Sequence, residues 1–195
     1  MSIPQTIREE AEGLHTEQEL AKLYELLCQT HPKRIVEFGT WLGLVTTVFG
    51  SWASDFNATV LSLDVRLFVP LRTLLVLTKY PVVLLQENEY KADSLALKRI
   101  AEYLDSEDKH FVYCDGGNKK RELWLYSRFL RSGDIIACHD YNRTKEDDTG
   151  LCFNPETERV YLEDVKKIQE RVNLVPLWGD DEISSEMHVM AFMKG

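Results

Sequence analysis

Short apolar runs alternate with helical patterns along the whole chain, and this alternation constrains the fold more than any other feature of the sequence. The apolar runs are nearly continuous, which is typical of strands that are buried on both faces of a sheet. Strands that alternate with helices usually pair in parallel, with helices on either side. The sequence therefore predicts an α/β protein with a doubly wound, mostly parallel sheet.

Seven strands are predicted, with helical periodicity between most of them. We expect the strands at 34–39, 59–65, 82–88, 110–116, 134–140, 173–178 and 188–194. We expect the helices at 16–30, 45–54, 70–79, 93–104, 119–130 and 158–171. No helical pattern separates the last two strands, so they should form a hairpin that makes the final strand antiparallel to the others. Together these elements predict a Rossmann-like, seven-stranded sheet with an antiparallel last strand.

Length and charge narrow the class of protein. The chain of 195 residues suits a single domain over 1–195, with 1–15 as an N-terminal extension. The net charge of -9 argues against a nucleic-acid partner, although Lys119, Lys120 and Arg121 form a local basic patch. We do not expect the polar, acidic N-terminus to be a signal peptide, and no apolar run of the sequence is long enough to span a membrane. We expect a cytoplasmic protein that does not contact a membrane. A homo-oligomer is compatible with this sequence.

The four cysteines form no CxxC pair. Cys114 and Cys138 lie in apolar, strand-like segments, which favours buried thiols in a reducing compartment. A zinc site made by these two cysteines and His139 is the alternative, but its ligand spacing matches no common pattern.

Polar residues follow each of the first five predicted strands. In an open α/β sheet, ligands bind beyond the carboxyl ends of the strands. The five strand ends carry, in chain order, Glu37 with Gly39 and Gly43; Asp64; Gln86 with Glu87 and Asn88; Asp115 with Gly116, Gly117 and Asn118; and His139 with Asp140, Tyr141 and Asn142. We therefore expect a ligand site at this edge.

The first two strand ends allow structural as well as ligand-binding roles. Gly39 and Gly43 can be turn glycines, or they can let the backbone approach a ligand. Glu37 must be paired inside its apolar segment, either with a cationic ligand group or with nearby backbone amides. Asp64 is expected to accept hydrogen bonds from ribose hydroxyls, or else to cap a helix. Trp41 and Trp124 are expected in the core more than beneath an adenine ring.

Two segments resemble known motifs. VEFGTWLGLVTT, residues 36–47, resembles the first motif of class I S-adenosylmethionine-dependent methyltransferases. Residues 111–142 resemble later motifs of a small branch of these methyltransferases, near cephalosporin-hydroxylase-like and phage-encoded sequences. In both, a strand that ends in DG is followed by a helix, an SGD-type turn and a strand that ends in HD. The resemblance spans 34–142 and implies the same seven-stranded sheet.

The resemblance also implies the residues that contact the cofactor, S-adenosylmethionine. They are Glu37, Gly39, Thr40, Gly43, Asp64, Gln86 or Glu87 near the adenine, and Asp115. Related catechol-type O-methyltransferases hold a divalent metal with one Asp at the fourth strand end and an adjacent Asp-Asn pair at the fifth. In this chain the Asn is displaced by one position, because Tyr141 separates Asp140 from Asn142.

The fourth and fifth strand ends leave three alternatives open for Asp115, His139 and Asp140. Two neighbouring carboxylates repel each other, so Mg²⁺ could lie between them, with Asn142 as a third ligand if the strand continues that far. Alternatively no metal binds and His139 is the general base, since its ordinary pKa suits that task. In the third alternative both aspartates only brace their loops.

The leading functional hypothesis is an enzyme that methylates a hydroxyl of a small molecule or glycan. The runner-up is a non-catalytic accessory protein that binds a nucleotide cofactor. An NAD-dependent oxidoreductase is disfavoured because the glycine spacing does not suit a pyrophosphate. No motif identifies the methyl acceptor.

Overall fold

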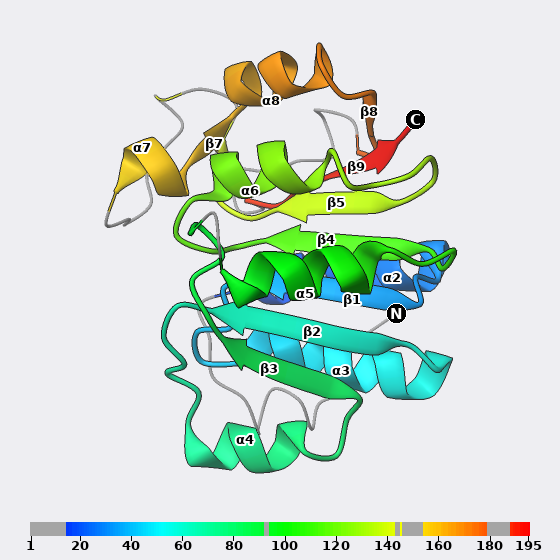
Figure 1. Ribbon diagram of the computed structural model, residues 1–195, viewed down its shortest axis with the longest axis vertical. Coiled ribbons are helices and arrows are strands. Elements are labelled where there is room, and N and C mark those ends of the chain that lie inside the picture. The colour runs from blue at the N-terminus through cyan, green and yellow to red at the C-terminus, as the bar shows by residue number, and fades with distance from the viewer. Residues whose placement is uncertain (1–14, 92–93, 143–144, 146–153, 179–187) are drawn as a thin grey trace. The chain divides into compact units, whose positions relative to one another are not determined.

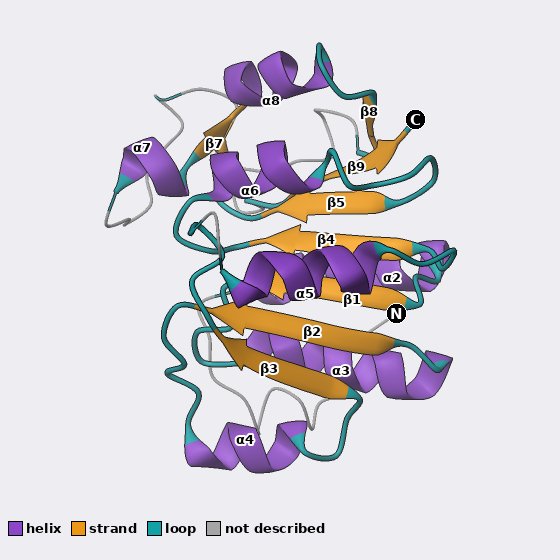
Figure 2. Cartoon of the chain, in the orientation of Figure 1, coloured by secondary structure: helices purple, strands orange, loops and turns teal. Residues whose placement is uncertain are grey.

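The computed structural model describes residues 15–91, 94–142, 145, 154–178 and 188–195. The chain divides into two compact units, Met1–His110 and Phe111–Gly195, which are considered in turn (Figures 1 and 2). The assignment of 1–195 to one domain stays a prediction.

The first unit contains a parallel sheet with the strand order β3-β2-β1. Its strands are β1 (Arg34–Phe38), β2 (Thr59–Asp64) and β3 (Val82–Gln86). The register pairs Phe38 with Leu63 and Asp64 with Gln86, so the carboxyl ends of these strands are aligned. The predicted strands at 34–39, 59–65 and 82–88 are confirmed to within two residues.

Helices lie on both faces of this sheet. They are α2 (Glu17–Thr30), α3 (Leu44–Phe56), α4 (Leu71–Leu77) and α5 (Leu95–Leu104). Figure 1 shows α5 in front of β1 and α3 behind β2. A Cβ at Gly50 of α3 would lie 2.7 Å from Val82 Cγ2, so this glycine allows the helix to approach β3 closely. The N-cap of α5 is Ser94, one residue after the predicted Asp93, which lies outside the described residues.

The start of α2 provides a stability prediction. Thr16 Oγ1 accepts the Glu19 N–H at 3.2 Å, and Glu19 Oε2 accepts the Thr16 N–H at 2.8 Å. Thr16→Ala should lower the free energy of unfolding by about 1 kcal/mol, since one helix-end N–H loses its acceptor. Urea unfolding measures this loss. Thr16→Ser retains the hydroxyl and serves as the control; equal loss in both variants would contradict the capping role.

The second unit contains the strand order β4-β5-β9-β8. Its strands are β4 (His110–Cys114), which begins at the last residue of the first unit, β5 (Ile135–Cys138), β8 (Leu174–Pro176) and β9 (Met190–Lys194). β4 and β5 are parallel, whereas β9 is antiparallel to both β5 and β8. The predicted antiparallel last strand is therefore confirmed, and the two units supply the seven strands of the predicted fold class.

Two details of the strands of the second unit differ from the prediction. The strand expected at 134–140 ends at Cys138, because Asp140 has a left-handed φ of 55° that extended backbone does not permit. The chain resumes in β6 (Tyr141–Asn142), which pairs with β7 (Val160–Tyr161) in a separate small sheet.

The predicted helices are also shorter. Helix α6 (Lys119–Tyr126) replaces 119–130, and α8 (Leu162–Gln169) replaces 158–171. The short helix α7 (Pro155–Glu158) was not predicted and overlaps the second range only at Glu158. The two-residue strand β7 interrupts the second pattern, which sequence periodicity alone did not reveal. Within the described part of the chain, no helix is long and apolar enough to cross a membrane.

Candidate functional site

A tight glycine turn follows β1 in the first unit. Gly39 and Gly43 have φ values of 90° and 88°, a region that glycine occupies without strain. The Gly39 N–H donates to Leu63 O at 2.8 Å, and the Gly43 N–H donates to Thr40 O at 2.8 Å. A Cβ at Gly43 would lie 3.0 Å from Thr73 Cγ2. Both glycines are therefore required by the turn itself, whatever ligand lies beside it.

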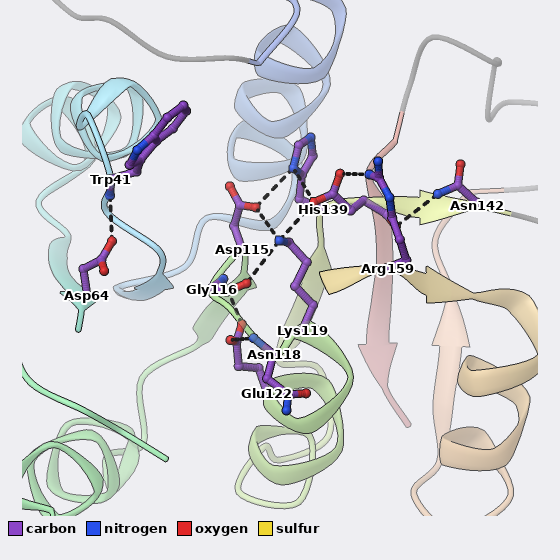
Figure 3. Close-up of polar contacts among 11 residues, drawn as sticks. Trp41, Asp64, Asp115, Gly116, Asn118, Lys119, Glu122, His139, Asn142 and Arg159 are labelled. Carbon is purple, nitrogen blue, oxygen red and sulfur yellow. Dashed lines mark hydrogen bonds and ion pairs between the residues drawn. The ribbon is translucent and has the colours of Figure 1, made fainter. Parts of the chain in front are cut away.

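Asp64 lies at the carboxyl end of β2, against this turn (Figure 3). Its Oδ2 accepts the Trp41 N–H at 2.9 Å, and its Oδ1 accepts the Arg66 N–H at 3.1 Å. Each carboxylate oxygen can accept a second hydrogen bond. The helix-cap alternative is wrong, because the next helix, α4, has Pro70 as its N-cap. Asp64 is thus a fixed, partly exposed acceptor at a strand end.

Glu37 is 1% exposed and belongs to a buried network of hydroxyl groups. Its Oε2 accepts hydrogen bonds from Thr46 Oγ1 and Ser62 Oγ, both at 2.6 Å. Thr40 Oγ1 lies 2.7 Å from the same Ser62 hydroxyl. The sequence predicts a cationic ligand or backbone amides as the partners of Glu37 and gives no sign of the hydroxyls of Thr46 and Ser62. Only the fold aligns these hydroxyls with the carboxylate.

The other ligand candidates of the first unit are more exposed. Gln86 is exposed at the end of β3, opposite Asp64 in the register. Trp41 is 41% exposed with φ 40°, so its expected place in the core is wrong; the left-handed turn holds it at the surface.

In the second unit Trp124 is half-buried, with the guanidinium carbons of Arg128 and Arg171 each 5.3 Å from its ring centroid.

The second unit brings Asp115, His139 and Asp140 together. Cys114 and Cys138 are partners in the register of β4 and β5, so the residues that follow them leave the sheet side by side. His139 Nδ1 lies 3.1 Å from Asp115 Oδ1 and 3.7 Å from Asp140 Oδ2. This contact confines the imidazole next to two carboxylates. Contact of Asp115 with the cofactor would involve residues of both units and stays a prediction.

Lys119, which the sequence indicates only as part of a basic patch, lies between both aspartates, and Figure 3 shows it beside Asp115. Its Nζ lies 3.4 Å from Asp115 Oδ1 and 3.0 Å from Asp140 Oδ2. Burial opposes the charged form, but the two carboxylates outweigh burial and raise the pKa of Lys119 above its ordinary value. Lys119 is therefore a buried ammonium. Its position four residues after Asp115, on the first turn of α6, was the available sequence signal.

Arg159 and Asn142 complete the surroundings of Asp140. Arg159 is 3% exposed, and its Nη1 pairs with Asp140 Oδ1. Asn142 does not share a strand face with Asp140, since the left-handed Asp140 separates β5 from β6. Instead, the Asn142 amide donates to the Asp140 carbonyl at 3.4 Å. The strand continuation on which its role as third metal ligand depended is absent.

Glu122 holds the loop that follows Asp115. Its carboxylate is fully buried and accepts the Gly116 N–H at 3.1 Å and the Asn118 N–H at 3.2 Å. Asn118 in turn caps α6 through its side chain. Periodicity gives no indication of this role, because Glu122 has the ordinary appearance of a helix-surface residue.

The donor set does not fit Mg²⁺ between Asp115 and Asp140. A hard cation there needs carboxylate oxygens that are available for coordination, whereas Lys119 and Arg159 already bind them. A zinc site at the cysteines is no better supported. Among the described residues, Cys114 and Cys138 belong to no group of three or more His, Cys, Asp or Glu side chains that could hold a metal ion, and burial raises the pKa of Cys138 to about 12.

No protein-family model matches the chain, and no curated protein sequence matches it. Solved structures are similar in fold. A candidate caffeoyl-CoA O-methyltransferase from Staphylococcus aureus is 17% identical, with a TM-score of 0.62, covering 98% of this chain and 91% of that one. A methyltransferase from Podospora anserina, bound to S-adenosylhomocysteine, is 16% identical with a TM-score of 0.59, covering 100% and 90%.

A third similar structure is the O-methyltransferase TomG from Streptomyces achromogenes, in complex with S-adenosylmethionine. It is 13% identical, with a TM-score of 0.59 and coverage of 98% of this chain and 91% of that one. At these identities the similarity is one of fold. It confirms the predicted Rossmann-like fold.

Proposed function

We propose that the chain is an S-adenosylmethionine-dependent methyltransferase that acts on a hydroxyl group of a small molecule or glycan. The observation that carries this proposal is the fixed Asp64 carboxylate beside the left-handed turn of Gly39 and Gly43. An acid at the end of the second strand, next to a glycine turn, commonly accepts ribose hydroxyls in Rossmann-like proteins. Similar folds that hold S-adenosylmethionine or its product support this choice of cofactor.

The residues of the first unit would bind and orient the cofactor. Asp64 retains a second acceptor position on each oxygen for the ribose hydroxyls. The turn between Gly39 and Gly43 lets backbone approach the ligand, and Gln86 lies beside Asp64 to contact the adenine. Glu37 supports the turn through the buried hydroxyls of Ser62 and Thr40. When bound, S-adenosylmethionine supplies an electrophilic methyl group.

His139 of the second unit would act as the general base. With Nδ1 donating to Asp115, neutral His139 presents Nε2 as the proton-accepting nitrogen. Removing the hydroxyl proton at Nε2 makes the acceptor oxygen nucleophilic. Asp115 orients the ring and stabilises the imidazolium that results. Most of the remaining rate acceleration comes from alignment of donor and acceptor, which can contribute roughly 7–11 kcal/mol.

Calorimetric titration tests the choice of cofactor. S-adenosylmethionine and S-adenosylhomocysteine should bind the full chain, and NAD should not. Saturable binding of NAD alone would replace this proposal by an oxidoreductase. Binding of both adenosyl compounds without turnover on a broad acceptor panel would favour the non-catalytic accessory role.

The cofactor site predicts the effect of Asp64→Ala. This change removes charge-assisted hydrogen bonds worth roughly 1.5–3 kcal/mol, so S-adenosylmethionine should bind about 10- to 150-fold more weakly. The same titration measures the loss, and Asp55→Ala, an exposed aspartate of α3, is the matched control. Gly39→Val should also weaken binding, because its φ of 90° is strained for valine. Wild-type affinity in both variants would show that the site is misplaced.

A further inference from the structure

A buried ammonium lies between the two carboxylates that end β4 and β5. Lys119 is 5% exposed, and its Nζ has three acceptors within hydrogen-bonding or ion-pair distance. They are Asp115 Oδ1 at 3.4 Å, Asp140 Oδ2 at 3.0 Å and Gly116 O at 3.1 Å. An ammonium has three donors and no acceptor, so a surrounding of oxygen atoms suits it. Lys119 thus has oxygen neighbours from two carboxylates and one carbonyl, as a bound cation would have (Figure 3).

A second cation pairs with these carboxylates. Arg159, 3% exposed, binds the other oxygen of Asp140. Among these four groups, the charges of Lys119 and Arg159 equal those of Asp115 and Asp140, and the nearby buried carboxylate of Glu122 accepts the N–H groups of Gly116 and Asn118. A divalent ion added here would meet two fixed positive charges in a poorly solvated place, where repulsion is weakly screened. The carboxylates therefore do not need a metal to relieve their repulsion.

We infer that Lys119 is a resident cation that takes the place of a divalent metal at this strand edge, and that the site is metal-free. With respect to catalysis, the inference rests on the proposed function, and it makes methyl transfer independent of metal. Lys119 and His139 share one oxygen of Asp115, at 3.4 Å and 3.1 Å. Lys119 is therefore a positioning residue, which holds Asp115 in place for the imidazole.

Manganese binding tests this inference without cofactor or acceptor, so it can fail independently of the proposed function. After exhaustive treatment with a chelator, Mn²⁺ is titrated up to about 1 mM, the weak end of oxygen-ligand cation sites. Electron paramagnetic resonance of the unbound ion measures the binding. Wild type should bind no ion at the aspartates. Lys119→Ser leaves two carboxylates and a space between them, and should gain a Mn²⁺ site that the additional change Asp115→Asn removes.

Lys119→Arg is the matched control, because it keeps the positive charge and should gain no Mn²⁺ site. Two results would overturn the inference: Mn²⁺ binding by wild type that Asp115→Asn abolishes, or no gain of binding in a folded Lys119→Ser protein. If Lys119→Ser does not fold, the wild-type measurement still decides. A rise in the wild-type melting temperature on adding Mn²⁺, absent in Asp115→Asn, would then reject the metal-free site.

Discussion

His139→Gln should lower kcat for methyl transfer by about 100- to 10,000-fold, the usual contribution of a general base. The His139 ring is held by Asp115 at 3.1 Å, so glutamine can occupy the space but cannot take up a proton. Binding of S-adenosylmethionine should change little, because Gly39 and Asp64 belong to the other unit and the glutamine amide can still donate to Asp115, the predicted ligand residue beside it. A radiolabelled methyl-transfer assay measures kcat once an acceptor is identified, and calorimetry measures binding.

His31→Gln provides the matched control, since His31 is an exposed residue at the end of α2 and should retain wild-type kcat. The same assay, repeated after treatment with a chelator, distinguishes a general base from a bound metal as the group that activates the acceptor hydroxyl. Activity that survives the chelator but is lost in His139→Gln would identify the base. Activity that disappears on chelation and returns with Mg²⁺ would contradict both the base and the metal-free site. Full activity in Asp115→Asn and Asp140→Asn would leave these acids as loop braces.

Lys119→Met should lower the free energy of unfolding by about 3–5 kcal/mol, the cost of removing one partner from a buried ion pair. Methionine has a similar length but leaves Asp115 and Asp140 without the ammonium between them. For a chain of this size the melting temperature should fall by roughly 6–20 °C. Urea or thermal unfolding measures the change.

Two comparisons distinguish the ion pair from simple packing. Lys98→Met removes an exposed lysine of α5 and should alter stability by less than about 0.5 kcal/mol. Asp115→Asn combined with Lys119→Met should be less destabilised than the sum of the single changes, since the removed charges are partners. Strict additivity of the two changes would contradict their coupling.

The contribution of Lys119 to the free energy of unfolding depends on pH with a defined sign. Because the pKa of Lys119 is raised in the folded protein, its stabilising contribution is complete below the unfolded lysine value of about 10.4. It is lost as pH rises through the folded pKa. The stability difference between wild type and Lys119→Met should therefore be constant, with respect to this lysine, from neutral pH to about pH 10, and should shrink above it.

Local patterns in the sequence determined the strands, the helices and the fold class. Strands such as Arg34–Phe38 and His110–Cys114 are apolar runs whose burial follows directly from composition. The capping box at Thr16 and Glu19 fixed the start of α2. Predicting an antiparallel last strand required only the absence of a helix before β9. These features depend on neighbours within a few residues, so the sequence alone contains them.

Tertiary structure decided the chemistry at the strand ends. Two aspartates predict a cation between them, but only the packing of α6 and β7 shows that Lys119 and Arg159 supply the positive charge. The left-handed Asp140 ended the strand, and the hydroxyls of Thr46 and Ser62 reached Glu37 from separate elements. Contacts between residues far apart in the chain depend on how elements pack, and local periodicity does not encode them.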